Sequence, residues 1–285
     1  MSRIKKIIIA VIVVAVLVFV ELRFNIVRNI IFQFSSDAYI NYVSGSEYEQ
    51  ALINDPICAK DMQTPDIELV ETDLSIVTAR YEMHDKLVEK YKLNDIATAE
   101  SDFDKALQIL KWLTENTYYN GAQMNLLTDD TLDILDDSFG KPFYGAINCR
   151  YKAIAFSDCL VAVGIKAYPI CMISSGFNDN HFTARVYISE FGKWCMFDPS
   201  FGCWFSDKYG NTLDTYEVRD MFIKGNSPQI NGYTFNGTQE AFDVYLNGFL
   251  KHNMSNLSTW EDNSPERREK ASFSERKRFI AKLPE

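Results

Sequence analysis

The chain has 285 residues, of which 47% are hydrophobic, and its 39 acidic and 29 basic residues give a net charge of −10. This length allows one sizeable domain with an appendage. The acidic balance argues against nucleic acid as the main partner, because neutralising phosphates needs a basic surface. The sequence contains no phosphate-binding glycine loop, dinucleotide fingerprint or internal repeat, so we expect no cofactor.

Residues 1–23 have the features of a membrane signal anchor. Arg3, Lys5 and Lys6 precede the unbroken apolar run IIIAVIVVAVLVFV, residues 7–20. The run is shorter than the about 20 apolar residues of a usual transmembrane helix and falls in the range of a signal-peptide core. No small-x-small cleavage site follows it. We therefore expect an uncleaved anchor with its basic end in the cytoplasm and the bulk exported; cleavage would instead give a secreted protein.

Residues 24–96 are predicted to form an N-terminal, mostly helical region, a stalk or a lid, interrupted before Pro56 and Pro65. The next expected helix runs from Asp102 to Tyr118. Its apolar residues recur at a helical spacing and would bury one broad stripe.

Cys149 stands where a polar loop gives way to the apolar-periodic run CRYKAIAFSDCLVAVG. A thiol in the first turn of a helix feels the positive end of the backbone dipole and unpaired N–H groups, and both favour the thiolate. Cys149 is therefore a candidate nucleophile, which needs a base and a group to orient that base.

Residues 181–198 are predicted to form a β-hairpin. His181 opens the alternating run HFTARVYIS, a turn EFGK follows, and the second strand KWCMF ends at Asp198, before Pro199. A turn centred between residues 190 and 191 places Asp198 opposite Thr183. His181 is then its diagonal neighbour on the same face, roughly 7–8 Å away along the backbone and within side-chain reach.

The block from Asn148 to Phe201 resembles the transglutaminase-like superfamily, a rearranged relative of papain-type cysteine enzymes. Its matching elements are the helix NCRYKAIAFSDCLVAVGIKAY, the strand NDNHFTARVYISEFGKW and the segment MFDPSF. The resemblance implies an α+β fold with a papain-like core, in which the nucleophile begins a buried helix packed on an antiparallel sheet, preceded here by the N-terminal membrane helix.

The resemblance also implies roles for individual residues. Cys149 would form a thioester with a peptide or glutamine carbonyl, His181 would transfer the proton, and Asp198 would fix the imidazole tautomer. The backbone N–H of Cys149 is the natural first oxyanion donor. Further oxyanion or cleft candidates are Gln123 and Asn120, in a loop before the nucleophile, and Trp204, in an aromatic loop after Asp198.

The domain assignment places the catalytic domain at residues 97–250 and a charged tail, expected to be solvated or disordered, at 251–285. The six cysteines show no CxxC pair and no metal-ligand spacing, so we expect no metal. Cys159 and Cys195 are expected to be core residues. His84 and His252 belong to no group of candidate catalytic or metal-binding residues, and they are expected at the surface.

The predicted function is that of a cysteine protease or amidase, with hydrolysis favoured over cross-linking because no feature specifies an amine channel. The expected partners are a peptide or protein substrate and the membrane. A catalytically silent binding or scaffolding module at the cell surface is the alternative, and the oligomeric state is left open.

Overall fold

The computed structural model describes residues 3–24, 78–119, 121, 129–141, 145–173, 180–232, 245–254 and 256–258. The helices are α1 (Arg3–Phe24), α7 (Glu82–Tyr91), α8 (Leu93–Ile96), α9 (Asp102–Asn116), α10 (Thr131–Ser138), α11 (Cys149–Ala162), α12 (Thr215–Ile223), the π-helix η1 (Tyr245–Leu250) and α14 (Lys251–Asn253). The strands are β1 (Ala167–Ile173), β2 (Asn180–Ile188), β3 (Lys193–Asp198), β4 (Cys203–Ser206), β5 (Gln229–Gly232) and β6 (Asn256–Ser258).

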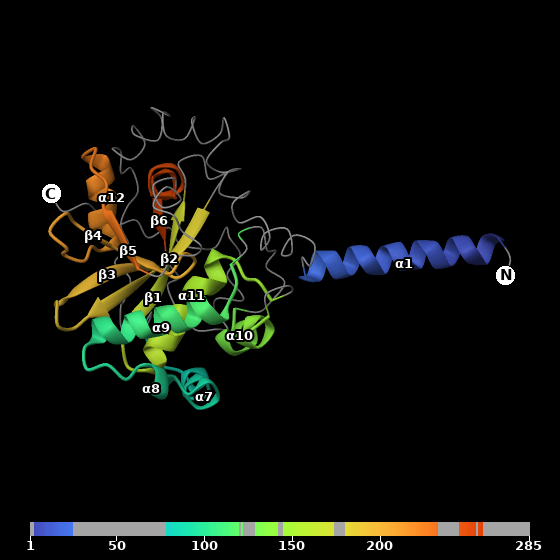
Figure 1. Ribbon diagram of the computed structural model, residues 1–285, viewed down its shortest axis with the longest axis horizontal. Coiled ribbons are helices and arrows are strands. Elements are labelled where there is room, and N and C mark those ends of the chain that lie inside the picture. Colours follow the sequence, from blue (N-terminus) through green and yellow to red (C-terminus); the bar gives the residue numbers. More distant parts are fainter. Residues whose placement is uncertain are drawn as a thin grey trace.

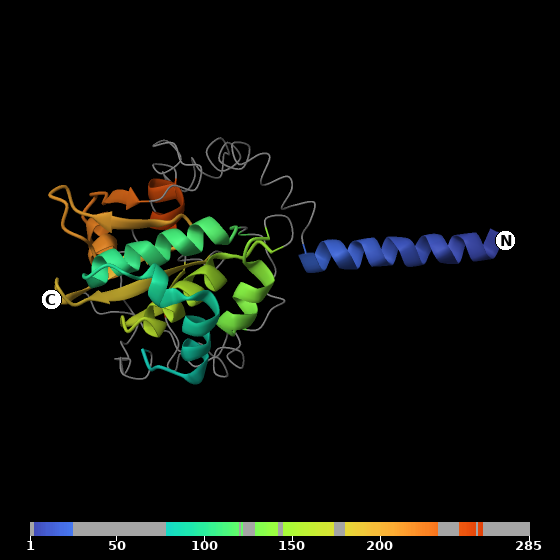
Figure 2. The ribbon, with the colours of Figure 1, turned by 60° about the horizontal axis from the view of Figure 1, so that its bottom comes forward.

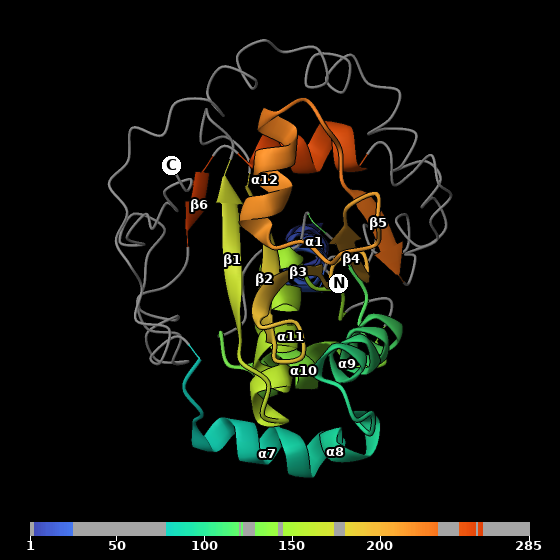
Figure 3. The same ribbon diagram turned by 90° about the vertical axis from the view of Figure 1, so that its left-hand side faces the viewer.

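The six strands form one antiparallel sheet in the order β5-β4-β3-β2-β1-β6 (Figure 1). One apolar cluster joins helices α7 to α11 to the sheet, and a second joins β1, β3 and β4 to α12 and η1. In Figure 3, α7 and α8 accordingly lie at one end of the molecule and α12 at the other. The predicted α+β fold with an antiparallel sheet is confirmed.

Helix α11 is the central helix of the first cluster. Every residue from Tyr151 to Ala162 is buried. Most of these residues are apolar and they lie on every face, which is typical of a helix enclosed by the rest of the fold. It packs against β1 and β2 and runs beside α9 (Figure 2).

The hairpin β2-β3 has the register that the count of residues predicts. Ala184 lies opposite Phe197 and Val186 opposite Cys195. Continuing that register by one pair sets Thr183 beside Asp198, so that His181 and Asp198 share a face of the sheet.

The turn of this hairpin caps the N-terminus of α9. The Glu190 carboxylate accepts hydrogen bonds from the backbone N–H of Phe103 at 2.7 Å and of Asp102 at 3.3 Å. In the opposite direction, the Asp102 carboxylate accepts a hydrogen bond from the backbone N–H of Ser189 in the turn. Since the first N–H groups of a helix lack partners within it, Glu190 satisfies donors that would otherwise need water.

We expect Glu190→Ala to lower the free energy of unfolding by about 1 kcal/mol, the usual worth of a helix cap. Urea denaturation of wild type and variant measures the change. Glu100→Ala, which removes an exposed glutamate beside the same helix, is the matched control. Equal effects of the two substitutions would show that the cap contributes nothing.

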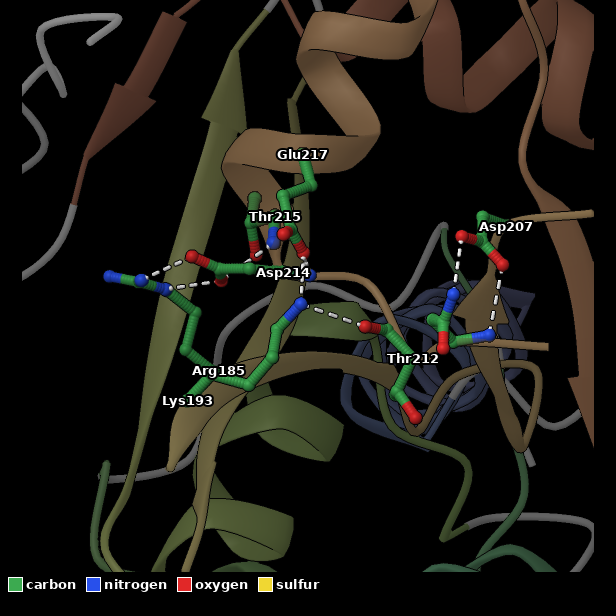
Figure 4. Close-up of polar contacts among 8 residues, drawn as sticks. Arg185, Lys193, Asp207, Thr212, Asp214, Thr215 and Glu217 are labelled. Atoms are coloured by element: carbon green, nitrogen blue, oxygen red, sulfur yellow. Dashed lines mark hydrogen bonds and ion pairs between the residues drawn. The ribbon is translucent and has the colours of Figure 1, made fainter. Parts of the chain in front are cut away.

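A polar cluster ties the hairpin to the start of α12 (Figure 4). Arg185 on β2 makes two hydrogen bonds to the carboxylate of Asp214, at 2.8 and 2.5 Å. Asp214 is the N-cap of α12, and Glu217 accepts from its backbone N–H in a capping box. Lys193 on β3 donates to Glu217 at 2.6 Å. These contacts hold α12 over the sheet.

The expected anchor falls on α1, which Figure 1 shows apart from the rest of the described chain. Among the described residues, no helix combines the length and the apolar character that a membrane crossing needs. Most of residues 24–96 and residues 259–285 lie outside the described residues. The sequence places the end of the catalytic domain at residue 250. In the structure β6 pairs with β1, so the sheet extends past that residue.

The prediction that His84 lies at the surface is wrong. Its side chain is 2% exposed, and its Nε2 lies 3.5 Å from a carboxylate oxygen of Asp158 on α11. The ring accepts the backbone N–H of Tyr81 at 2.8 Å, which closes the first turn of α7, and it stacks on the Tyr81 ring. The imidazole is therefore buried because α7 packs on α11. The side chain of His252 lies outside the described residues.

Candidate active site

Cys149 is the first residue of α11, as the sequence predicts, and it is partly exposed at the end of this otherwise buried helix. Asn148 is the N-cap, and its side-chain oxygen accepts from the backbone N–H of Tyr151 at 3.2 Å. Such a cap fixes the start of the helix. The Cys149 thiol therefore lies at a defined position, the end of the helix where unpaired backbone N–H groups point outward.

His181 and Asp198 meet directly. Nε2 of His181 lies 2.6 Å from Oδ2 of Asp198, and both side chains are fully buried. The hydrogen bond uses Nε2, so any contact with the other ring nitrogen is made at Nδ1. The Cys149 thiol is among the groups that raise the pKa of this imidazole. The structure thus brings His181 and Asp198 into direct contact, and the part of Cys149 in a catalytic triad stays a prediction.

The electrostatics of this group favour a charged imidazole. Burial alone would lower the pKa of His181, because it disfavours the cation. The charge of Asp198, its hydrogen bond and the interaction with Cys149 outweigh burial and raise the pKa of His181 to about 10. At neutral pH the ring can therefore hold a proton beside the sulfur.

Asp198 has further donors besides His181. Its Oδ1 accepts the backbone N–H of Ser200 at 2.8 Å, and its Oδ2 also accepts the hydroxyl of Tyr245 at 2.5 Å. A buried carboxylate needs such donors, because burying a polar group without hydrogen-bond partners is costly. Ser200 lies in the turn after β3, whereas Tyr245 reaches in from the distant η1.

Lys152, three residues after Cys149 on α11, is a buried cation near the same carboxylate. It is 1% exposed, and its Nζ donates to the carbonyl oxygen of Thr117 at 2.7 Å and to the Thr117 hydroxyl at 2.6 Å. Burial lowers the pKa of Lys152 to about 7, although the charge of Asp198 opposes this shift. Lys152 therefore ties α11 to the C-terminal end of α9.

We expect Lys152→Met to change how stability depends on pH. The pKa of Lys152 is lower in the folded chain than in the unfolded chain, so the unfolded chain binds more protons between about pH 7 and 10.5. Over that window the unfolding free energy of the wild type should rise relative to K152M, by up to about 1.4 kcal/mol per pH unit. Urea denaturation at pH 7, 8, 9 and 10 measures this difference; a constant difference would contradict it.

The remaining predicted site residues have different outcomes. Asn120 and Gln123 lie outside the described residues, so their part in an oxyanion hole stays a prediction. Trp204 lies on β4, half-buried, with its ring edge-to-face against Phe103 at 5.9 Å. It also lies directly against the backbone of Gly232, where a Cβ would come within 2.6 Å of the indole. These contacts give Trp204 a packing role, and its contact with substrate stays a prediction.

Sequence reasoning missed three residues around the site: Lys152, Tyr245 and Arg150. Lys152 carried a partial signal, because it stands in a helix with apolar residues on every face, which is typical of a buried helix. Arg150, next to Cys149, pairs with the buried carboxylate of Asp129. Tyr245 lies 47 residues after Asp198, and no local pattern connects the two.

Residues 90–199 match the model of a protein family described as the transglutaminase-like superfamily. The chain therefore carries a transglutaminase-like superfamily domain. A comparison with curated proteins finds no match. Among solved structures, a protein from Cytophaga hutchinsonii described as a "putative cysteine protease" is similar at 16% identity and a TM-score of 0.36. That similarity covers 66% of this chain and 62% of the other.

Proposed function

We propose that this chain, with its transglutaminase-like superfamily domain at residues 90–199, is a cysteine enzyme that attacks peptide or glutamine amide bonds. The family match supports a cysteine enzyme at the coarse level. The observation that carries the finer proposal is the buried pair of His181 and Asp198, joined at 2.6 Å, with Cys149 acting on the same ring. Cys149, His181 and Asp198 each have one role in the proposed reaction.

In the first half of the reaction, the sulfur of Cys149 attacks the carbonyl carbon while the protonated His181 faces it. The oxyanion forms next to the backbone N–H groups at the start of α11. As the C–N bond breaks, Nδ1 of His181 gives its proton to the leaving ammonia or amine. A thioester on Cys149 remains, and His181 is neutral.

In the second half, neutral His181 takes a proton from the acyl acceptor, which attacks the thioester and releases the acid or a new amide. Asp198 holds the ring in place through Nε2 and stabilises the imidazolium each time it forms. We propose water as the main acceptor, which makes the enzyme a protease or amidase. A lysine amine as acceptor would make it a cross-linking enzyme.

Casein whose lysines have been dimethylated is a suitable test substrate, since its glutamines are intact and its own amines are blocked. The purified chain should release ammonia from glutamine or create new N-termini, and added monodansylcadaverine should be incorporated poorly. Strong incorporation with little hydrolysis would replace the hydrolase by a cross-linking enzyme. No activity, together with an unreactive Cys149, would favour a catalytically silent scaffold.

We also propose that residues 1–23 attach the protein to a membrane, with the catalytic domain on the extracytoplasmic side. This rests on the sequence, in which Arg3, Lys5 and Lys6 precede an apolar run. The test is fractionation of cells that express the full chain. Recovery with membranes after carbonate extraction supports the anchor, recovery from the medium indicates cleavage, and recovery with soluble cell contents would contradict both.

A further inference from the structure

Oδ2 of Asp198 is shared by two donors. It accepts from Nε2 of His181 at 2.6 Å and from the hydroxyl of Tyr245 at 2.5 Å. Burial, followed by the charge of Asp198, raises the pKa of Tyr245 well above its ordinary value. The phenol therefore keeps its proton and acts as a donor to the carboxylate.

Aromatic rings from separate segments pack around this pair. The ring of Tyr245 lies 4.4 Å from that of Phe201 and 6.2 Å, edge-on, from the imidazole of His181. Phe201 in turn lies 6.0 Å from His181 and 5.4 Å from Tyr119. Tyr119 forms a β-bridge with Ile147, just before the nucleophile. Such an apolar surrounding strengthens the hydrogen bonds inside it, because little water competes.

We propose that Tyr245 is a positioning residue of this site. Its hydroxyl holds Oδ2 of Asp198 at the position from which the carboxylate orients the His181 ring. The same hydrogen bond takes up part of the negative charge of Oδ2, which would otherwise act on the ring alone. The proposal rests on the function proposed above. Tyr245 belongs to η1, beyond residues 90–199 that match the family, so the C-terminal segment contributes directly to the site.

The charged and titratable groups around the pair set the expected effect. Asp198 interacts with Lys152 of α11, His181 of β2, Cys203 of β4 and Tyr245 of η1. In addition, Cys149 interacts with His181, and Tyr119 with Tyr245. Removing the hydroxyl leaves His181 as the one side-chain donor to Oδ2 among the residues that the structure describes. The imidazolium should then hold its proton more tightly, and less free base should be available near neutral pH.

The test is Tyr245→Phe in the full-length chain with p-nitrophenyl acetate as acyl donor. Acetylation of Cys149 appears as a burst of p-nitrophenol, and the steady rate that follows reports hydrolysis of the thioester. We expect Y245F to keep the burst, to hydrolyse the thioester tenfold or more slowly at pH 7, and to show its pH inflection at higher pH.

Tyr168→Phe is the matched control. It removes the same atom from another buried tyrosine, whose hydroxyl is bonded by Arg185 on the hairpin. Y168F should hydrolyse the thioester with the wild-type inflection. A Y245F variant that matches Y168F in rate and inflection overturns the inference, while a wild-type burst on Cys149 leaves the proposed function standing. A wild type that shows no burst overturns the proposed function itself.

A second variant covers the case in which Y245F fails to fold. 3-Fluorotyrosine placed at position 245 alone keeps the shape of the side chain and makes the hydroxyl a stronger donor. It should move the inflection of thioester hydrolysis to lower pH, in the direction opposite to Y245F. An unchanged inflection would contradict the positioning role.

Discussion

Cys149→Ala is expected to abolish turnover, with hydrolysis of dimethylated casein and of p-nitrophenyl acetate falling by at least about 10³-fold. The substitution removes the sulfur that forms the thioester in the proposed reaction. The side chain is partly exposed at the end of α11, so the fold should be retained. Rates measured on protein with wild-type near-UV circular dichroism provide the test.

Cys159→Ala is the control for this prediction. Cys159 is on the same helix, ten residues later, and burial raises the pKa of its thiol well above the ordinary value. It is therefore inert and packed in the core, as the sequence predicts. We expect C159A to turn over substrate at close to the wild-type rate. An active C149A variant would show that the chemistry lies elsewhere.

Asp198→Asn is expected to lower turnover by roughly 10²- to 10⁴-fold without removing either reacting group. The carboxylate is what offsets burial and raises the pKa of His181 to about 10. With an amide in its place, burial dominates, and the pKa of His181 should fall below its ordinary 6.5. The ring would then be neutral at pH 7, and the thiol would lose its cationic partner.

Asp198→Asn should also change the pH dependence of stability. Because the pKa of His181 is higher in the folded chain than in the unfolded chain, the stabilisation from the His181–Asp198 pair is complete below about pH 6.5 and is lost as pH rises through 10. The stability advantage of wild type over D198N should therefore shrink by up to about 1.4 kcal/mol per pH unit in that window.

The two buried cations of the site have opposite effects on stability. Raising the pH from 7 to 10 removes stabilisation at His181 and relieves the penalty of a charged Lys152. The stability difference between wild type and D198N should therefore decline over this range, while that between wild type and K152M should grow. Urea denaturation across the range measures both differences. Parallel curves for all three proteins would contradict the assignment of these pKa shifts.

Part of the fold and the site could be predicted because its signals are local. The polar-to-apolar change at Cys149 indicated where α11 begins. Alternation and a countable turn indicated the register that sets His181 and Asp198 on one face. A hairpin brings together residues that are near in sequence. The alternation of side chains along its two strands is therefore nearly sufficient to predict which residues share a face.

The rest depends on contacts between segments that are distant in the sequence. His84 becomes buried only when α7 packs on α11, and Tyr245 reaches Asp198 only because η1 folds back over the sheet. Neither residue stands in a periodic pattern that indicates its partner. Lys152 differs, since the mostly apolar helix around it hinted at its burial, but its partner Thr117 is the C-cap of α9, a separate segment.

The reactivity of Cys149 toward iodoacetamide, measured as a function of pH by peptide mass spectrometry on the folded chain, tests the central claim most directly. The account predicts that at pH 7 Cys149 is alkylated far faster than the buried cysteines Cys159, Cys171, Cys195 and Cys203. It also predicts that D198N loses most of this preference. A wild-type chain in which Cys149 reacts no faster than the buried cysteines would contradict the claim that Cys149, His181 and Asp198 act together.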